Sequence, residues 1–480
     1  MQNFLALAAI AFFPLLSLVL FALQPFNRAV LWTVMSAQLL LPVGIFIKFD
    51  QIPQFDKYSV PSMCLIAAVG LALMGKMRIH PPKSFGLVGI LITMYLVGPV
   101  ITSEQNHEAL KYGPLLLPGV GLYDAVSALI LAIITLAPYI IGRELLRDAS
   151  DDREILKVLV VSMLVYSLPL LFEVRFSPQL HYWVYGTYPS MFLQSMRGEG
   201  FRPMAFMGHG LIAAHFALLA FIAAVTFWRT RTSVVSFSIR KTDNYRAVAG
   251  YLGIVLLLCR TMGVNIYGLV LAPLILLANP KHLVRLSVIL VVISLLYPTL
   301  RYLDLVPTGK LLSTANSVSE ERAESLGVRF YNERMLLAHA VEKPLFGWGR
   351  FGRNRVYDSE TGKDLTLTDG EWIIVFGQFG AFGFIAEFGL LSIAVFKAAA
   401  AFRLVRSNED RIYLASLTAI VAISIFDLLP NAFLTPWTWL ITGALLGRAE
   451  ALLSRQVEPA AVAPAARAAP RKLWPITESG

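Results

Sequence analysis

Long apolar runs recur along nearly the whole chain, and short polar segments separate them. A helix needs about 20 apolar residues to cross a bilayer, with a range of about 17–25. A transmembrane barrel would show alternating segments of about 10 residues, and this sequence has none. The pattern predicts an all-α polytopic integral membrane protein with about 11–13 transmembrane helices. The candidate spans are 4–22, 28–48, 61–75, 84–101, 121–141, 155–172, 208–228, 247–259, 264–278, 285–303, 372–396, 411–429 and 433–449.

Two of these spans, 247–259 and 264–278, are short and flank Arg260. They predict either an interrupted pair of helices that dips towards Arg260 or one long tilted helix. A charge between apolar runs is costly in a bilayer and is a functional hypothesis by default. The alternative is that Arg260 marks a short turn at the membrane interface.

The apolar pattern divides the chain into four parts. Residues 1–303 form an N-terminal transmembrane bundle that includes a polar loop at 173–207. A large, partly helical loop follows at 304–371, and 372–449 carry the last transmembrane helices. The tail at 450–480 is rich in Ala and Pro and has too little apolar mass to fold, so it is predicted to be disordered.

Composition and charge agree with a membrane protein. The 480 residues are 56% hydrophobic and 15% charged, whereas soluble domains average about 25% charged residues. The net charge of +10 could suggest nucleic acid, but most Lys and Arg lie in short loops between apolar runs. Basic loops of this kind mark the cytoplasmic side. We therefore expect no nucleic-acid partner, a cytoplasmic tail, and the loops 173–207 and 304–371 on the outer side.

Cysteine usage excludes one class of site. The chain has two cysteines, Cys64 and Cys259, and both lie in or at the edge of apolar spans. A disulfide framework or a cysteine-based metal site is therefore not expected.

The loop 173–207 leads into the apolar span 208–228 through Arg202 and His209. If the helix already begins at Arg202, His209 lies two turns further along. Arg202 would sit at the membrane boundary, where it could clamp the phosphate of a lipid-linked ligand. The alternative, of equal weight, is a snorkelling arginine that anchors a helix end. His209 alone is more often a packed interfacial histidine.

The large loop carries the densest group of chemically capable residues. Its first part is predicted to be a helix with Ser319 as the N-cap and Pro344 as the stop. The charged side chains of this helix include Arg329, Arg334 and His339. A glycine-rich turn follows in PLFGWGRFGRNR, which contains Arg350 and Arg353 and could present N–H groups to phosphate. It does not match a nucleotide P-loop, because no GK[ST] follows.

Carboxylates mark the start of the span 372–396. Asp369 and Glu371 precede it, and Asp369 could be either a helix N-cap or a general base for a sugar hydroxyl. Glu387 and Asp427 lie within or near spans and could couple a transporter to an ion. Neither is expected to have a second intramembrane acid on a shared face, which weakens the transporter hypothesis.

Three segments, in this order, resemble the O-antigen ligase and polysaccharide polymerase superfamily of bacterial envelope proteins. They are FRPMAFMGHGLIAAH, VRFYNERMLLAHAVEKPLFGWGRFG and TDGEWIIVFGQFGAFGF. The resemblance covers roughly residues 200–395. The N-terminal half is similar only in hydropathy.

This resemblance implies a metal-independent glycosyltransferase of the bacterial inner membrane, with no cofactor and an active site that faces the periplasm. The donor would be an undecaprenyl-pyrophosphate-linked glycan. Arg202 and Arg329 correspond to the family's two pyrophosphate-binding arginines. Asp369 stands where the family has a histidine, so the general base would be Asp369 or else His339 or Glu371.

The same resemblance implies substrate contacts and partners. The expected substrate-binding residues are Arg260, His209, Arg334, Arg350, Arg353, Glu371 and His339. A flippase and a chain-length co-polymerase are expected partners in the membrane. We favour a polymerase over a ligase that uses a lipid acceptor. The alternative from another class is a transporter or flippase of lipid-linked oligosaccharide, although the sequence shows no internal repeat.

Overall fold

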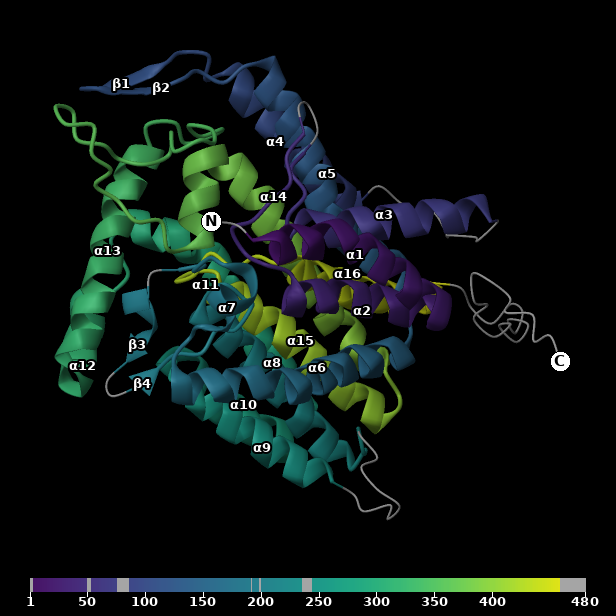
Figure 1. The fold of residues 1–480 in the computed structure, drawn as a ribbon. Helices are drawn as coiled ribbons and strands as arrows, with labels where there is room; N and C mark the ends of the chain where they lie inside the picture. Colours follow the sequence, from purple (N-terminus) through teal and green to yellow (C-terminus); the bar gives the residue numbers. More distant parts are fainter. Residues whose placement is uncertain are drawn as a thin grey trace.

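The apolar runs fold into a bundle of helices (Figure 1). A computed structural model describes residues 3–49, 53–75, 86–190, 192–197, 200–234 and 244–457. The helices are α1 (Phe4–Leu23), α2 (Phe26–Leu40), α3 (Ser59–Met74), α4 (Gly86–Glu104), α5 (Leu122–Leu145), α6 (Ala149–Phe176), α7 (Leu180–Tyr185), α8 (Gly210–Thr230), α9 (Tyr245–Leu258), α10 (Met262–Leu277), α11 (Pro280–Tyr302), α12 (Thr308–Val318), α13 (Glu320–Ala340), α14 (Glu371–Ala401), α15 (Asn408–Asp427) and α16 (Pro436–Val457). Two short 3₁₀ helices are η1 (Phe192–Ser195) and η2 (Phe402–Leu404).

The strands of the described part form two small antiparallel hairpins. One pairs β1 (Leu110–Tyr112) with β2 (Leu115–Leu117), and the other pairs β3 (Met196–Arg197) with β4 (Gly200–Phe201). Both lie in loops outside the bundle. The fold of the described residues is therefore all-α in its core.

Seven helices in the described residues are long and apolar enough to cross a membrane: α1, α4, α5, α6, α8, α11 and α14 with its 3₁₀ extension η2. Three shorter apolar helices, α3, α9 and α10, lie beside them. This confirms a polytopic α-helical membrane protein. The expected total of about 11–13 spans stays a prediction, because it also counts helices that fall outside these length and composition limits.

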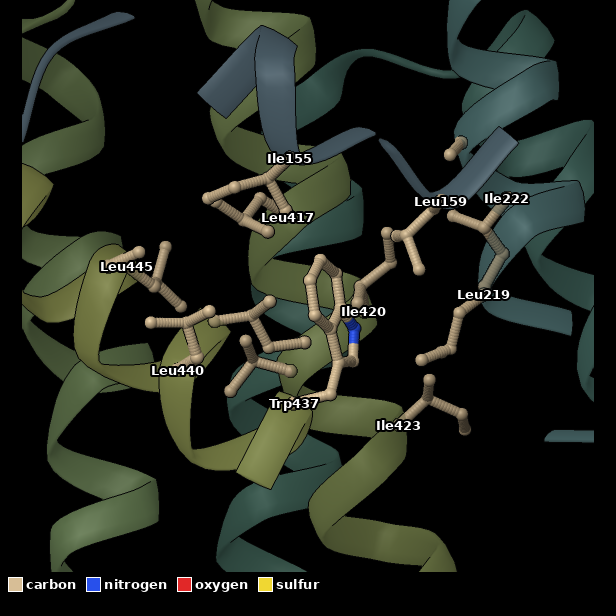
Figure 2. Packing of buried hydrophobic residues seen from close by; sticks show 14 of the residues in the cluster. Ile155, Leu159, Leu219, Ile222, Leu417, Ile420, Ile423, Trp437, Leu440 and Leu445 are labelled. Atoms are coloured by element: carbon tan, nitrogen blue, oxygen red, sulfur yellow. The ribbon is translucent and has the colours of Figure 1, made fainter. Parts of the chain in front are cut away.

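The core of the bundle lies between α6, α8, α15 and α16. Figure 2 shows branched aliphatic side chains from these four helices packed around the indole of Trp437. Almost every residue of α15 after Arg411 is buried, so this helix runs through the centre. The labelled side chains are Ile155, Leu159, Leu219, Ile222, Leu417, Ile420, Ile423, Trp437, Leu440 and Leu445.

Hydrogen bonds between distant segments define the two ends of the bundle. At one end, Lys57 donates to the carbonyl of Phe206, and the N–H of Glu371 donates to the carbonyl of Leu428. We call this the loop end, because the described parts of five connecting segments meet there: 41–49 with 53–58, 105–121, 177–190 with 192–197 and 200–209, 303–370, and 428–435. At the other end, Arg143 pairs with Glu450 at 2.8 Å. Which end faces the cytoplasm stays a prediction.

The short apolar runs around Arg260 form two separate helices, α9 and α10. Both pack against α8. Arg260 lies in the turn between them with a left-handed backbone, φ 50°. The interrupted pair is therefore correct, and the single long tilted helix is wrong.

The large loop and the tail differ from the prediction in three details. The loop contains a helix, α12, that the sequence did not predict, in addition to the expected α13. Ser319 occupies the N-cap of α13 but makes no side-chain capping bond there. Residues 450–457 were assigned to a disordered tail, but they continue α16 to Val457. The rest of the predicted tail, 458–480, lies outside the described residues.

Helix α14 is broken inside its span at Gly380, whose φ of 64° and ψ of −163° are not helical. A break in a membrane helix frees backbone groups that lipid cannot satisfy. Here the segment 344–349 satisfies them. The N–H groups of Trp348 and Gly349 donate to the carbonyls of 377 and 378, and those of 381 and 382 donate to the carbonyls of 344 and 345.

This insertion explains why glycine occupies positions 347 and 380. It also corrects the expectation about the N–H groups of the glycine-rich turn. A Cβ on Gly380 would overlap the carbonyl of Leu345, and a Cβ on Gly347 would overlap residue 378, so the backbones approach too closely for side chains. The glycine-rich turn was expected to offer its N–H groups to phosphate. The N–H groups at 347, 348 and 349 instead donate to carbonyls of the protein.

Candidate functional site

Arg329 and Asp369 form an ion pair at the loop end. The Nε of Arg329 in α13 lies 3.5 Å from the Oδ2 of Asp369, the second residue before α14. The side chains are 31% and 44% exposed, so a ligand from solvent could reach both. An exposed ion pair of this length contributes little stability, about 0–1 kcal/mol. The pair is therefore open to competition from a stronger anion.

A buried polar network fixes α13 in place. One turn after Arg329, Glu333 accepts from Arg301 Nε at 3.0 Å and from the hydroxyl of Tyr297 at 3.1 Å. The ring of Tyr297 packs edge-on against Trp372, the second residue of α14. Burial raises the pKa of Glu333, and the nearby Arg301 guanidinium opposes this shift. The network was not predicted, because its members come from three separate helices.

Backbone bonds hold the start of α14 on the loop after α15. The N–H of Glu371 donates to the carbonyls of Leu428 and Asn431. The N-cap of α14 is Gly370, and no side chain caps this helix. The N-cap role considered for Asp369 is therefore wrong, and its carboxylate faces Arg329 instead.

Arg202 and Arg260 lie together at the turn between α9 and α10. Arg202 is 8% exposed, its aliphatic stem packs on Gly210, and it lies within electrostatic range of Cys259, the residue before Arg260. The guanidinium of Arg260 lies on Gly200, where a side chain would leave it no room. Two arginines thus gather at the loop end beside the start of α8.

His209 is the N-cap of α8, which begins at Gly210. Its Nδ1 accepts from the N–H of Leu211 at 3.1 Å. A neutral His209 therefore carries its proton on Nε2. His209 therefore lies at the start of the helix, as the apolar span 208–228 predicted, and the condition that the helix begins at Arg202 is not met. The ring of His209 packs against Phe433, with 5.6 Å between centroids.

Two buried charged residues clamp the segment that follows Arg202. Glu173 is fully buried and accepts from the N–H groups of Met204 and Ala205 at 2.8 and 2.7 Å. Lys57 donates to the carbonyls of Leu41 and Phe206. Burial lowers the pKa of the Lys57 amine to about 7. A neutral amine still has two N–H groups for these two carbonyls, so the clamp holds in either charge state.

The loop 428–435 joins the two halves of the site. It contacts His209 through Phe433, and it receives the N–H of Glu371. Asp427, directly before this loop, interacts electrostatically with Arg329. This loop therefore links the surroundings of Arg329 to the start of α8, where the stem of Arg202 packs on Gly210.

Four expected substrate-binding residues lie apart from this group. Arg353 is 1% exposed and donates to the carbonyls of 118 and 348, and Arg350 donates to the carbonyl of 124. His339 stacks on Trp348 at 4.4 Å and contacts the carbonyl of 353. Arg334 is exposed on a different face of α13 from Arg329. Arg353 and His339 both contact Trp348 and so brace the segment inserted into α14.

Two carboxyl groups, Glu371 and Glu387, lie on either side of the break in α14. Glu387 is 6% exposed, its Oε1 has no hydrogen-bond partner, and it interacts electrostatically with Glu371. In a straight helix 16 residues (387 − 371) would span about 24 Å. The helix is broken between the two acids at Gly380, and both interact electrostatically with Tyr95 of α4. The expectation that Glu387 lacks a second intramembrane acid on a shared face stays a prediction, because Glu371 is the first residue of α14 at the loop end.

No cluster of three or more His, Cys, Asp or Glu side chains suited to a metal ion occurs among the described residues. The chain matches no protein-family model and no curated protein sequence. The resemblance to the O-antigen ligase superfamily therefore stays a prediction. Functional assignment depends on the geometry of the loop end.

Proposed function

We propose that this chain is a membrane glycosyltransferase that polymerises an envelope polysaccharide. It would take a glycan linked to a polyprenyl pyrophosphate and transfer it to a sugar hydroxyl. The observation that carries this proposal is the accessible Arg329–Asp369 pair at the loop end, the same end of the bundle at which Arg202 and Arg260 lie. Cations for a phosphate group and a carboxylate for a hydroxyl proton are the two groups that such a transfer needs.

The proposed reaction is a single displacement. Asp369 accepts the proton of the acceptor hydroxyl, the acceptor oxygen forms a bond to the anomeric carbon, and the bond from that carbon to the phosphate oxygen breaks. The electron pair of the broken bond remains on the pyrophosphate. Arg329 and Arg202 stabilise this developing charge. The product would have inverted anomeric configuration.

Asp369 and the pyrophosphate of the donor compete for Arg329, and this competition links donor binding to the basicity of Asp369. In the free protein, the guanidinium of Arg329 faces the carboxylate of Asp369 at 3.5 Å. A pyrophosphate carries more charge and offers oxygens that match the guanidinium fork. When it takes Arg329, Asp369 loses its cationic partner and becomes a stronger base. The carboxylate is thus activated when the donor is bound.

The remaining assignments rest on the resemblance. The protein would lie in a bacterial inner membrane with its loop end in the periplasm, and the donor lipid would be undecaprenyl pyrophosphate. A flippase would supply the donor, and a co-polymerase would set chain length. A ligase differs only in its acceptor.

The test is transfer by purified protein in detergent, with a lipid-pyrophosphate-linked repeat unit as substrate. Arg329→Ala should lower the rate about 10²–10³-fold, and Asp369→Asn about 10²–10⁴-fold. Arg334→Ala is the matched control, because Arg334 lies on the same helix but is exposed. Normal transfer by both site variants at normal protein level would refute the proposal.

A transporter of lipid-linked sugars is a second candidate, and the buried Glu387 in the broken helix α14 favours it. Buried intramembrane acids and broken helices are typical of ion-coupled transporters. Glu387→Gln separates the two functions. In a transporter, this change should abolish proton-dependent movement of lipid-linked sugar across vesicles. In a glycosyltransferase, it should leave transfer at the loop end intact.

A further inference from the structure

A cavity of about 390 Å³ lies between the start of α6, the start of α15 and the end of α8, and the proposed reaction does not use it. Asp148, directly before α6, lies 3.9 Å from Arg455 of α16. This contact places the cavity at the same end of the bundle as the Arg143–Glu450 pair, opposite the loop end. Its volume falls in the range of about 300–1,000 Å³ that small-molecule sites occupy.

Groups of opposite charge line this cavity from different helices. Arg153 and Lys157 belong to α6, whereas Glu409 and Asp410 lie in the first turn of α15. No ion pair within 4.0 Å joins the two cations to the two acids, and all four residues belong to the described part of the chain. Both signs of charge therefore remain available to a ligand that enters the cavity.

The other polar groups of the cavity leave this charge balance unchanged. A third acid, Glu154, already pairs with Arg28 of α2 at 2.7 Å. The carboxylate of Glu409 accepts from the hydroxyl of Tyr413 at 2.8 Å and keeps further lone pairs. Among the described residues, the cavity thus offers two cations and two carboxylates. A ligand that carries one charge of each sign matches it better than a purely anionic ligand does.

The face of α6 that lines the cavity continues into the membrane as an exposed apolar stripe. Val161, Val165 and Leu168 follow Lys157 at helical spacing and so share its face. Val165 and Leu168 are each 67% exposed, and α6 is long and apolar enough to cross a membrane. In a bilayer, these side chains contact acyl chains. The charged cavity therefore lies where the headgroup of such a lipid would be.

We propose that this cavity binds the headgroup of a zwitterionic phospholipid with a primary amine, phosphatidylethanolamine. Arg153 and Lys157 hold the phosphate oxygens, and Glu409 and Asp410 accept hydrogen bonds from the ammonium group. The acyl chains lie along the exposed stripe of α6. This inference is independent of the proposed function, because the site lies at the opposite end of the bundle from Arg329 and Asp369.

The chemistry of the headgroup predicts an order of affinity. Phosphatidylglycerol has a phosphate but no ammonium group, so the two carboxylates of the cavity repel its charge. The ammonium group of phosphatidylcholine is trimethylated, so it is larger and has no N–H to donate. Both lipids should therefore bind more weakly than phosphatidylethanolamine. Basic residues that act only as a charged surface would instead favour the anionic lipid, phosphatidylglycerol.

The test measures binding of these three lipids, in short-chain form, to the purified full-length protein in neutral detergent by native mass spectrometry. The double change Arg153→Gln with Lys157→Gln should weaken phosphatidylethanolamine binding about tenfold or more, because charge-assisted hydrogen bonds to phosphate are lost. Glu409→Gln with Asp410→Asn should weaken it similarly but strengthen phosphatidylglycerol binding. Arg403→Gln is the control, since Arg403 is exposed at the same end but does not line the cavity.

Three outcomes would overturn the inference. The first is tighter binding of phosphatidylglycerol than of phosphatidylethanolamine by the wild-type protein. The second is unchanged phosphatidylethanolamine binding in the variant that lacks both acids. The third is equal affinity for soluble glycerophosphoethanolamine, which would show that the acyl chains contribute nothing. Arg153 and Glu409 are exposed, so the single changes Arg153→Gln and Glu409→Gln repeat the test if a double variant does not fold.

Discussion

The Nε of Arg301, at the end of α11, lies 3.0 Å from the Oε2 of Glu333 in α13. Both side chains are largely buried, at 4% and 12% exposed. The Arg301 guanidinium also lies over the ring of Phe330, 5.3 Å from its centroid. This pair attaches the helix of the large loop to the membrane bundle, and it lies one turn from Arg329.

Removing one member of this pair should destabilise the protein. Arg301→Ala leaves the carboxylate of Glu333 buried without its cation, which typically costs about 3–5 kcal/mol. Thermal unfolding in detergent measures the effect, and Arg334→Ala, exposed on the same helix, should change little. The double change Arg301→Met with Glu333→Leu should be milder than Arg301→Ala, because no charge remains buried. A double variant as unstable as the single one would contradict this account.

A side chain at the break in α14 should also destabilise the protein. Gly380→Ala forces an L-residue into a left-handed backbone, at roughly 1–2 kcal/mol, and overlaps the carbonyl of Leu345. Gly250→Ala is the matched control, since Gly250 lies in α9 and a Cβ added there would meet nothing within 4 Å. It should be neutral or stabilising by up to about 1 kcal/mol. Equal melting temperatures for the two variants would show that the break tolerates a side chain.

Lys57 should make stability rise with pH. Burial lowers the pKa of its amine from 10.5 to about 7, so between these values the unfolded chain binds one more proton than the folded chain. The free energy of unfolding therefore increases as pH rises from about 7 to 10, by at most about 1.4 kcal/mol per pH unit. Lys57→Met removes this contribution. The difference between the two proteins, followed by melting temperature against pH, isolates it, and parallel curves would argue against the shifted amine.

Glu173 should influence how tightly Arg202 binds a diphosphate, because it holds the backbone segment that follows Arg202. Glu173→Gln replaces an acceptor oxygen by an N–H₂ group that faces backbone N–H groups, at a cost of about 1–3 kcal/mol. These N–H groups belong to 180, 204 and 205. Because two of them follow Arg202 closely, Arg202 should lose its fixed position, and farnesyl diphosphate, a short lipid diphosphate, should bind the purified protein more weakly. Glu360→Gln, an exposed change at the same end, is the control. Unchanged binding in Glu173→Gln would show that the contacts of Glu173 do not position Arg202 for ligand binding.

Hydropathy alone predicted most of the bundle. The run at 285–303 became α11 (Pro280–Tyr302), and the run at 208–228 became α8 (Gly210–Thr230). The hydropathy pattern predicted a helix as far as residue 48, but α2 ends at its C-cap, Leu41. Gly44 has a φ of 73°, which the apolar pattern does not reveal. The pattern also missed α12, whose sequence is too polar to read as a span.

The site was less predictable because it depends on which residues meet. Arg329 and Asp369 were expected in one site, and the fold joins them. His215 ends the first of the three family-like segments yet was not considered, since its partner Asp427 comes from another helix. The break at Gly380 was likewise not predicted, because the apolar run through 372–396 is continuous and the inserted segment 344–349 comes from the large loop.

The insertion of 344–349 into α14 also has a consequence for biogenesis. The inserted segment is synthesised before the helix that it completes, so its partner groups already exist when α14 is made. An unbroken α14 could enter the bilayer with all its backbone bonds made, and the break could then form only as the segment docks. Assembly would thus be ordered by the direction of translation, with the large loop required at its final position before the last three helices can close the bundle.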